Sequence, residues 1–348
     1  MDFQKVEQVP FFFILGKSRS GTTLLQTILD AHPNAMVPVE SIFLVYLKKK
    51  YFRIKNWNEN RVNQFINDLY KERKFRYFWN EDREKLRADL QAIPKNKISF
   101  ALLCKYIYLN YSSVFTKENI QLIGDKNPVY PFFISDILEV FPDAKFIHLI
   151  RDYRDVIVSS REALTNRSAA YFAYEWRDVN ERIEKEKAKH SSAFYTLKYE
   201  DLITDPEFFL KEVCAFLMLS YSPKILDFYN RPENYFYNKA HDNTRQPINK
   251  KSMDKWKSKL SEKEILIADF IAGTFAKKYN YESEDIRKNI FLNVLFWTAM
   301  LRQKMEVFIF RWYQKMPIRF KNTKAILAKK FHVFSHHSRA EDRFLKGK

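Results

Sequence analysis

The sequence predicts an α/β fold in which helices cover both faces of a central parallel sheet. An apolar run at residues 10–15 precedes a loop with a glycine at each end and then apolar residues at helical spacing. Strand-like runs return at residues 120–123, 145–150 and 194–197, each followed by a polar turn and a helical pattern. Repeated strand–helix units of this kind indicate a parallel sheet.

The chain is long enough for one large domain with additions. It has 348 residues, 46% of them apolar, so it can bury a sizeable core. We assign residues 1–285 to this domain, with a charged, helical insertion at 56–118 beside the sheet. Residues 286–348 are expected to form a basic, amphipathic helical extension, with an internal boundary at Pro317.

The formal net charge of +18 is concentrated in this extension. Residues 286–348 hold 15 Lys or Arg against 3 Asp or Glu, a net of +12. Such a balance favours anionic partners such as nucleotides, lipid head groups or nucleic acid. The extension is a candidate for peripheral membrane contact or for homodimer formation.

Cysteine usage and apolar run lengths favour a cytoplasmic protein. Cys104 and Cys214 both lie in apolar segments, as free thiols of a reducing compartment do. The run at 10–15 leads directly into the glycine loop, and the run at 289–301 is shorter than the ~20 residues of a spanning helix. We expect the protein to be at most peripheral to a membrane.

The loop after the first strand has the pattern of an anion site. Two of the chain's five glycines, Gly16 and Gly21, lie in it. Glycine lets backbone N–H groups converge on an anion, and the following helix adds the positive end of its dipole. A nucleotide-triphosphatase loop has Lys where Thr22 stands, so here the basic residue lies inside the loop, at Arg19. The loop's side-chain donors are Lys17, Ser18, Arg19, Ser20, Thr22 and Thr23.

A second anion site is predicted after the strand at 145–150. Arg151 stands at the strand end and Ser159 eight residues later. If Asp155 caps the next helix, the guanidinium and the hydroxyl meet at the helix N-terminus. A surface ion pair between Arg151 and Asp152 is the alternative. Two anion sites on successive strand–helix units need a ligand with two separate phosphates.

These segments resemble those of sulfotransferases that use 3′-phosphoadenosine 5′-phosphosulfate (PAPS). The loop sequence Arg-Ser-Gly-Thr-Thr-Leu, with Asp30 to Pro33 after it, is similar to the branch with tyrosylprotein sulfotransferases and many bacterial enzymes. The resemblance covers roughly residues 10–280. It implies a P-loop-like sulfotransferase fold, with residues 17–23 on the 5′-phosphosulfate and with Arg151 and Ser159 on the 3′-phosphate.

Two later nucleotide contacts are implied by the resemblance alone. Tyr199 matches a strand-end tyrosine that the family uses near the nucleotide, although an ordinary aromatic residue at a sheet edge is the alternative. The stretch 243–248 resembles the family's late nucleotide-binding loop. Gln246 stands where a basic residue is expected, so Arg245 or Lys250 would substitute for it.

Sulfuryl transfer needs a base on the acceptor hydroxyl and positive charge at the leaving oxygen. Glu40 aligns with the glutamate base of tyrosylprotein sulfotransferases, and Lys126 with a catalytic lysine of that branch that would share the leaving-group charge with Arg19. The alternatives are that Glu40 merely begins a helix at 42–47 and that Lys126 is an ordinary lysine. We predict no required metal, because a sulfuryl group carries less charge than a phosphoryl group.

The sequence around Glu40 favours an apolar acceptor. Tyrosylprotein sulfotransferases have a basic residue after their Glu-Thr pair, whereas Ile42 and Phe43 follow Glu40 and Ser41 here. Aromatic residues of the insertion are candidates for a pocket wall: Tyr70, Phe75, Tyr77, Phe78 and Trp79. We expect a sterol or lipid alcohol as the small-molecule acceptor, and a saccharide as the second choice.

Two other functions remain open. A P-loop kinase or ATPase would use Asp152 to hold a metal. A basic protein that binds nucleic acid or a membrane surface would interleave aromatic residues with Lys and Arg on an exposed face, yet most aromatic residues here lie in apolar runs. We therefore expect no nucleic-acid partner.

Overall fold

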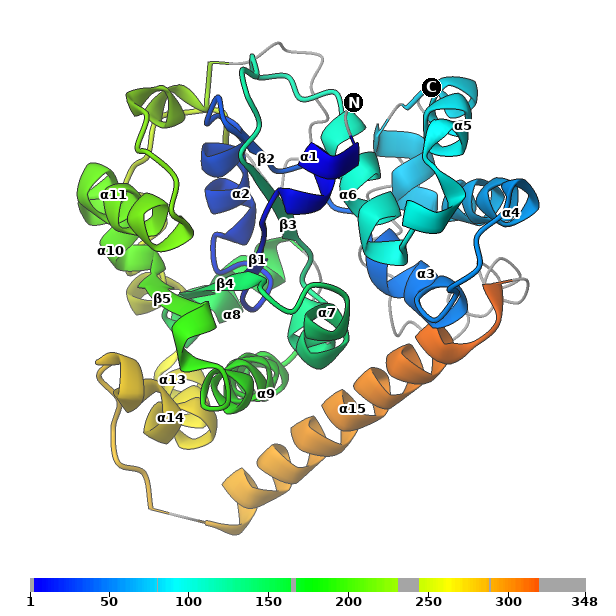
Figure 1. Cartoon of the computed structure of the whole chain (residues 1–348). Coiled ribbons are helices and arrows are strands. Elements are labelled where there is room, and N and C mark those ends of the chain that lie inside the picture. The colour runs from blue at the N-terminus through cyan, green and yellow to red at the C-terminus, as the bar shows by residue number, and fades with distance from the viewer. Residues whose placement is uncertain (1–2, 80, 164–166, 231–243, 288, 319–348) are drawn as a thin grey trace.

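Five parallel strands form the centre of the molecule, in the order β2-β3-β1-β4-β5 (Figure 1). The structure is a computed structural model that describes residues 3–79, 81–163, 167–230, 244–287 and 289–318. The strands are β1 (Phe11–Leu15), β2 (Ala35–Met36), β3 (Leu122–Lys126), β4 (Lys145–Ile150) and β5 (Phe194–Lys198). The predicted parallel α/β fold is confirmed, with β2 as a short strand that the sequence did not indicate.

Alternate side chains of β1 divide the core between the two faces of the sheet. Phe11, Phe13 and Leu15 join one apolar cluster, and Phe12 and Ile14 join another. The face of Phe12 is covered by α2 (Thr22–Asp30), α10 (Tyr199–Thr204) and α11 (Pro206–Leu217). The face of Phe11 is covered by α1 (Phe3–Gln8), α6 (Phe100–Asn110) and α7 (Ile134–Val140). The sheet is thereby shielded on both sides, as parallel sheets require.

The chain between β2 and β3 is helical, as predicted. It contains α3 (Phe43–Tyr51), α4 (Glu59–Leu69), η1 (Phe75–Trp79, a π-helical turn), α5 (Arg83–Ala92), η2 (Lys95–Lys97) and α6. The pocket-wall prediction is wrong for Phe75 and Trp79, which are each 1% exposed and pack against Phe43 and each other at ring distances of 5.1 to 5.7 Å. Tyr70 and Phe78 are partly buried against this core. These aromatic residues belong to the same apolar cluster as Phe11 and Phe13 of β1, so they pack the insertion against the sheet.

The second half of the chain adds a third apolar cluster around the buried Trp176. Its longer helices are α8 (Tyr153–Ala163), α9 (Ala169–Lys187), α13 (Glu262–Ala268) and α15 (Ile290–Lys315). Shorter helical pieces are η3 (Tyr130–Phe132), η4 (Ser191–Ala193), η5 (Pro223–Asp227), α12 (Trp256–Lys259), η7 (Asp269–Gly273), α14 (Thr274–Ala276) and η8 (Lys277–Tyr279). The helix α15 lies within the predicted C-terminal extension at 286–348, of which residues 319–348 lie outside the described residues. Within the described ranges, no helix has both the length and the apolar character needed to cross a membrane.

The connection after β1 lies at the point where the strand order of the sheet reverses. β2 lies beyond β3 on one side of β1, whereas β4 and β5 lie on the other side. In open parallel sheets, ligands bind at the carboxyl edge of such a point. The segments that follow β1, β3 and β4 therefore meet at the edge where the sequence predicts both anion sites.

Candidate active site

The loop from Gly16 to Gly21 has a tight backbone that requires glycine at both of its ends. Arg19 (φ 76°) and Gly21 (φ 94°) are both left-handed. A Cβ atom at Gly16 would collide with the carbonyl oxygen of Leu149, and one at Gly21 would collide with the ring of Tyr199. The helix α2 begins directly after Gly21, so its first backbone N–H groups lack intrahelical partners and face the loop. This geometry suits an anion.

The side chains of the loop are largely buried. Lys17 donates from Nζ to Ser18 Oγ at 2.8 Å, and lies 3.1 Å from Glu175 Oε2 on α9. Thr22 is buried at the first position of α2. Ser20 Oγ is buried and has no hydrogen-bond partner among the described residues. Such a hydroxyl is costly to leave unpaired, so it fits a ligand that accepts its hydrogen bond.

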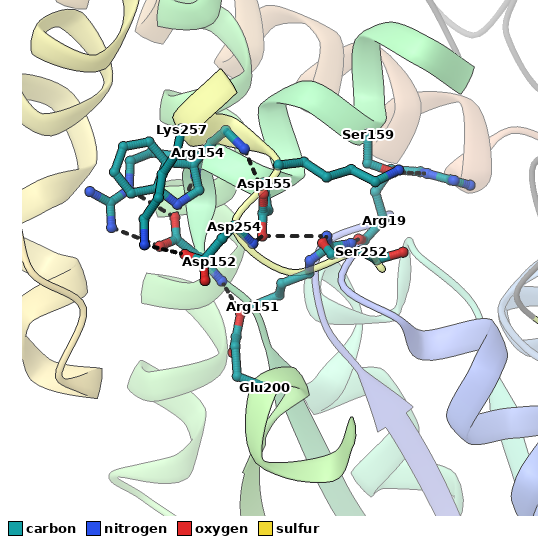
Figure 2. A network of polar contacts seen from close by, with 12 residues as sticks. Arg19, Arg151, Asp152, Arg154, Asp155, Ser159, Glu200, Ser252, Asp254 and Lys257 are labelled. Atoms are coloured by element: carbon teal, nitrogen blue, oxygen red, sulfur yellow. Dashed lines mark hydrogen bonds and ion pairs between the residues drawn. The ribbon is translucent and has the colours of Figure 1, made fainter. Parts of the chain in front are cut away.

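Two arginines meet beside the loop (Figure 2). Arg151 donates from Nη1 to the backbone oxygen of Arg19 at 3.1 Å and from Nη2 to the backbone oxygen of Ser252. Arg19 in turn donates from Nε to Ser159 Oγ at 3.1 Å. Burial, and next the charge of Arg151, lower the pKa of Arg19. The two positive charges repel each other, so an anion bound between them would be favoured.

Tyr199 connects the second site to the glycine loop. Its ring is 2% exposed, fills the space beside Gly21 and lies 4.6 Å from the guanidinium of Arg151. Arg151 is 5% exposed, and its Nε has no hydrogen-bond partner within the described part of the chain. The geometry therefore brings Tyr199 next to both predicted anion sites, while its contact with a nucleotide stays a prediction.

Asp155 does not cap the helix after β4, contrary to the expectation. It lies inside the first turn of α8, and its carboxylate accepts the backbone N–H groups of Asp254 at 2.9 Å and Trp256 at 3.0 Å. Asp152 takes the capping position, with Oδ1 accepting the Arg154 N–H at 2.8 Å and Oδ2 accepting from Nη2 at 2.7 Å. Both acids lie near the start of α8. Asp155 is bonded to the segment at 254–256, and Asp152 caps the helix.

Glu40 lies between two lysines near the first turn of α2. Its Oε1 accepts a hydrogen bond from Lys126 Nζ, and its Oε2 accepts one from Lys74 Nζ at 2.8 Å. Lys126 also donates to Thr23 Oγ1, at 2.9 Å, in the first turn of α2. The predicted catalytic residues Glu40 and Lys126 thus contact each other, and Thr23 joins them to the glycine loop.

Lys126 is the last residue of β3, whereas the sequence suggested that the strand ends before it. The side chain is 1% exposed, and burial lowers the pKa of Lys126, while the charge of Glu40 acts in the opposite direction. A lysine held at a strand end, rather than in a turn, has little freedom to move away from Thr23 and Glu40.

A buried acid supports this strand end. Asp125 accepts hydrogen bonds from the hydroxyl groups of Tyr108 and Tyr130, and its Oδ1 accepts the Lys126 backbone N–H at 2.7 Å. Burial raises the pKa of Asp125 to about 7, although these hydrogen bonds oppose the shift. Asp125 therefore fixes the backbone of Lys126 through this buried hydrogen bond.

Lys74 is a site residue that sequence reasoning missed. The buried Glu72 accepts the backbone N–H groups of Lys74 at 3.1 Å and Phe75 at 2.7 Å, and also the hydroxyl of Ser41 at 2.6 Å. Because Ser41 follows Glu40, Glu72 joins the two segments that carry the ion pair. Lys74 lies in a run of charged residues, from 71 to 74, where nothing local distinguishes it.

The segment before α12 contributes different residues from those predicted. Arg245 and Lys250 are exposed, and Asn243 lies outside the described residues. Ser252 instead contacts Arg151 through its backbone oxygen, and the ring of Trp256 lies 3.8 Å from the guanidinium of Arg154. The assignment of Arg245 to the nucleotide stays a prediction.

A family model matches the part of the chain that carries this site, except for the segment before α12. The family model described as "Sulfotransferase family" matches residues 10–223, which is more than half of the chain. The chain therefore belongs to the sulfotransferase family, as the resemblance implied.

Several curated relatives carry specific names. A protein-tyrosine sulfotransferase of Drosophila melanogaster is 26% identical over 265 residues, which cover 72% of this chain and 47% of that protein. Protein-tyrosine sulfotransferase 1 of Danio rerio is 22% identical over 271 residues, or 73% of this chain and 67% of that protein. The omega-hydroxy-beta-dihydromenaquinone-9 sulfotransferase Stf3 of Mycobacterium tuberculosis is 34% identical over 99 residues, 24% of this chain and 25% of that protein. The chain thus spans about half the length of the first relative.

Solved structures agree on the fold. The sulfotransferase domain from the curacin biosynthetic pathway has a TM-score of 0.52 and 20% identity, with 80% of this chain and 100% of that chain covered. The sulfotransferase domain from the Synechococcus PCC 7002 olefin synthase has a TM-score of 0.52 and 22% identity, with 79% and 96% covered. The predicted sulfotransferase fold is confirmed.

Replacing Asp125 with asparagine should remove a pH dependence of stability. The folded-state pKa of about 7 lies above the ordinary 3.8, so between these values the folded chain keeps a proton that the unfolded chain has lost. This contribution to stability is present below the ordinary pKa and is lost as pH rises through about 7. Between pH 4 and pH 7.5 the free energy of unfolding of the wild type should fall, relative to Asp125→Asn, by up to about 4 kcal/mol.

Urea unfolding followed across this pH range measures the difference. Asp143→Asn, at an exposed turn, is the control for loss of a surface carboxylate. Parallel stability profiles for the wild type and Asp125→Asn would contradict the assignment of a raised pKa to Asp125.

Proposed function

We propose that the chain transfers the sulfuryl group of PAPS to a hydroxyl group of an acceptor. The observation that carries the proposal is the pair of anion sites at the carboxyl ends of β1 and β4. Each site has a buried donor that is unpaired in the described part of the chain, Ser20 Oγ in the loop and Arg151 Nε beside it. A nucleotide with phosphates at both the 5′ and 3′ positions would satisfy both. Membership of the sulfotransferase family supports the same donor.

The proposed contacts follow the geometry. The 5′-phosphosulfate would be held by Lys17, Ser18, Arg19, Ser20, Gly21, Thr22 and Thr23. The 3′-phosphate would lie against Arg151 and Ser159, with Tyr199 packed beside them and Arg245 as a further contact. When bound, PAPS supplies the sulfuryl group on a good leaving group. We keep the expectation that no metal is required.

Glu40 is proposed as the general base. It takes the proton of the acceptor hydroxyl as that oxygen bonds to sulfur, while Lys126 and Arg19 stabilise the electron pair left on the departing phosphate oxygen. The two carboxylate oxygens of Glu40 accept hydrogen bonds from Lys126 and Lys74, which fix the position of the carboxylate. The Glu40 side chain is 17% exposed, so an acceptor can reach it.

A sterol or lipid alcohol is proposed as the acceptor, ahead of a saccharide. Ile42, partly buried beside the Glu40 segment, supports an apolar acceptor where a basic residue would suit an acidic peptide. The relative named for a hydroxylated menaquinone supports a lipid alcohol, although its match covers a quarter of this chain. The relatives named for protein tyrosine make a tyrosine peptide a necessary comparison.

A kinase or ATPase is less well supported. The carboxylate of Asp152, which would hold its metal, is hydrogen-bonded through both oxygens to Arg154. Thr22 also occupies the position of the lysine that contacts nucleotide phosphates in those enzymes.

Transfer of radioactive sulfate from labelled PAPS tests the proposal. The acceptors are cholesterol, a long-chain alcohol, a saccharide and a tyrosine peptide, each with a metal chelator present. We expect label in the sterol or the long-chain alcohol. Label in the peptide or the saccharide would replace the proposed acceptor and keep the donor, whereas transfer only after metal is restored would contradict the metal-free mechanism.

Glu40→Gln should lower turnover on the order of a hundredfold or more, the usual scale for loss of a general base. Binding of 3′-phosphoadenosine 5′-phosphate should persist, because the glycine loop and Arg151 are unchanged. Steady-state kinetics and calorimetry measure the two quantities. Glu118→Gln, at an exposed position, is the matched control. Normal turnover by Glu40→Gln would remove Glu40 from the role of base.

Arg151→Ala should weaken binding of 3′-phosphoadenosine 5′-phosphate by at least about tenfold more than binding of adenosine 5′-phosphate, which lacks the 3′-phosphate. Since Arg151 also holds the loop, Ser159→Ala provides a milder variant with the same expected direction. Calorimetric titration with both nucleotides gives the comparison. Equal losses for the two nucleotides in both variants would place the 3′-phosphate elsewhere.

A further inference from the structure

The helix α15 exposes a row of large apolar side chains, although Leu292 and Ala299 on its inner face are buried. Gln303, Glu306 and Gln314 are buried against the body of the protein. Large apolar side chains that are 51% to 84% exposed form a stripe on the outer face: Ile290, Phe291, Val294, Trp297, Leu301, Met305, Phe308 and Trp312. A continuous exposed apolar surface of this kind marks a site of interaction. Figure 1 shows α15 running along the outside of the molecule.

A buried polar network fixes which face of α15 points outward. The hydroxyl oxygen of Tyr171 lies 2.7 Å from Glu306 Oε2 and 3.0 Å from Gln303 Oε1, and Arg167 Nη1 lies 3.1 Å from Glu306 Oε2. Rotating the helix to bury the stripe would turn Glu306 away from Arg167 and leave that largely buried guanidinium without its charged partner, which is strongly unfavourable. The outward stripe is therefore a built feature of the fold.

The stripe is straight. Ile290, Leu301 and Trp312 are each eleven residues apart, and eleven residues make just over three turns of an α-helix. A left-handed coiled coil would need apolar residues every 3.5 positions on average. A straight stripe along 26 residues, about 39 Å long, suits a flat surface.

Positive charge surrounds the stripe. Arg302, Lys304 and Lys315 are exposed on α15, and its one acid, Glu306, is buried in the polar network. Residues 286–348 carry a net charge of +12 in sequence. Within the stripe, Trp297 and Trp312 have the amphipathic rings that favour a membrane–water interface.

We propose that α15 lies in the surface of a membrane that contains anionic lipid. The apolar stripe would enter the boundary between head groups and acyl chains, and the flanking lysine and arginine side chains would contact lipid phosphates. The proposal concerns where the protein acts and does not depend on the donor or the acceptor.

Cosedimentation of the full chain with vesicles tests this. Vesicles of phosphatidylcholine with phosphatidylglycerol should bind the protein at least about tenfold more tightly than phosphatidylcholine alone, and added salt should weaken the binding. Leu301→Glu combined with Phe308→Glu should weaken it on the order of a hundredfold. Lys304→Gln should cost about fivefold. Phe208→Glu, at a 54% exposed position on α11, is the matched control and should bind like the wild type.

Two outcomes would overturn the proposal. One is undiminished vesicle binding by the Leu301→Glu, Phe308→Glu variant. The other is a stable dimer in vesicle-free sedimentation that this variant dissociates, because the stripe would then be covered by a second copy of the chain. Unchanged binding of 3′-phosphoadenosine 5′-phosphate by the variant establishes that it is folded and separates this test from that of the donor.

Discussion

The guanidinium of Arg151 holds together three segments that are distant in sequence. From the end of β4 it donates to the backbone of Arg19 in the glycine loop and to the backbone of Ser252 before α12, and it packs on Tyr199 at the start of α10. Tyr199 in turn occupies the space that a side chain at Gly21 would need. The two hydrogen bonds of Arg151 offset part of the cost of burying the guanidinium, while Nε has no partner in the described part of the chain. Because Arg19 brings a second positive charge to the same place, the site is organised in advance for an anionic ligand.

The second centre is assembled from equally distant parts of the chain. Glu40 comes from the loop after β2, Lys126 from the end of β3, and Lys74 from the insertion. Two buried acids fix these segments, with Glu72 bonded to the backbone at Lys74 and Asp125 to the backbone of Lys126. Thr23 links this centre to the glycine loop, so the proposed base and the proposed donor site share the first turn of α2. Pre-organised charge of this kind is the main source of catalysis in group transfer.

Features with a local cause were predictable from sequence. The apolar run of β1, the glycine pair and the helix after them follow from neighbouring residues, and so does the length of α15. β2 has two residues, too few to show any periodicity. The end of β3 has the composition of a turn, and Asp125 is accommodated there because the hydroxyl groups of Tyr108 and Tyr130 donate to it. The role of Lys74 and the burial of Phe75 and Trp79 depend on how the insertion packs, which no local pattern specifies.

The most direct test of the central claim is calorimetric titration with 3′-phosphoadenosine 5′-phosphate, beside ATP, in the presence of a metal chelator. The claim is that two anion sites, at Gly16 to Gly21 and at Arg151, hold one nucleotide that carries both a 5′ and a 3′ phosphate. We expect a dissociation constant on the order of micromolar for the bisphosphate and much weaker binding of ATP. Preference for ATP, or no binding of the bisphosphate, would contradict it.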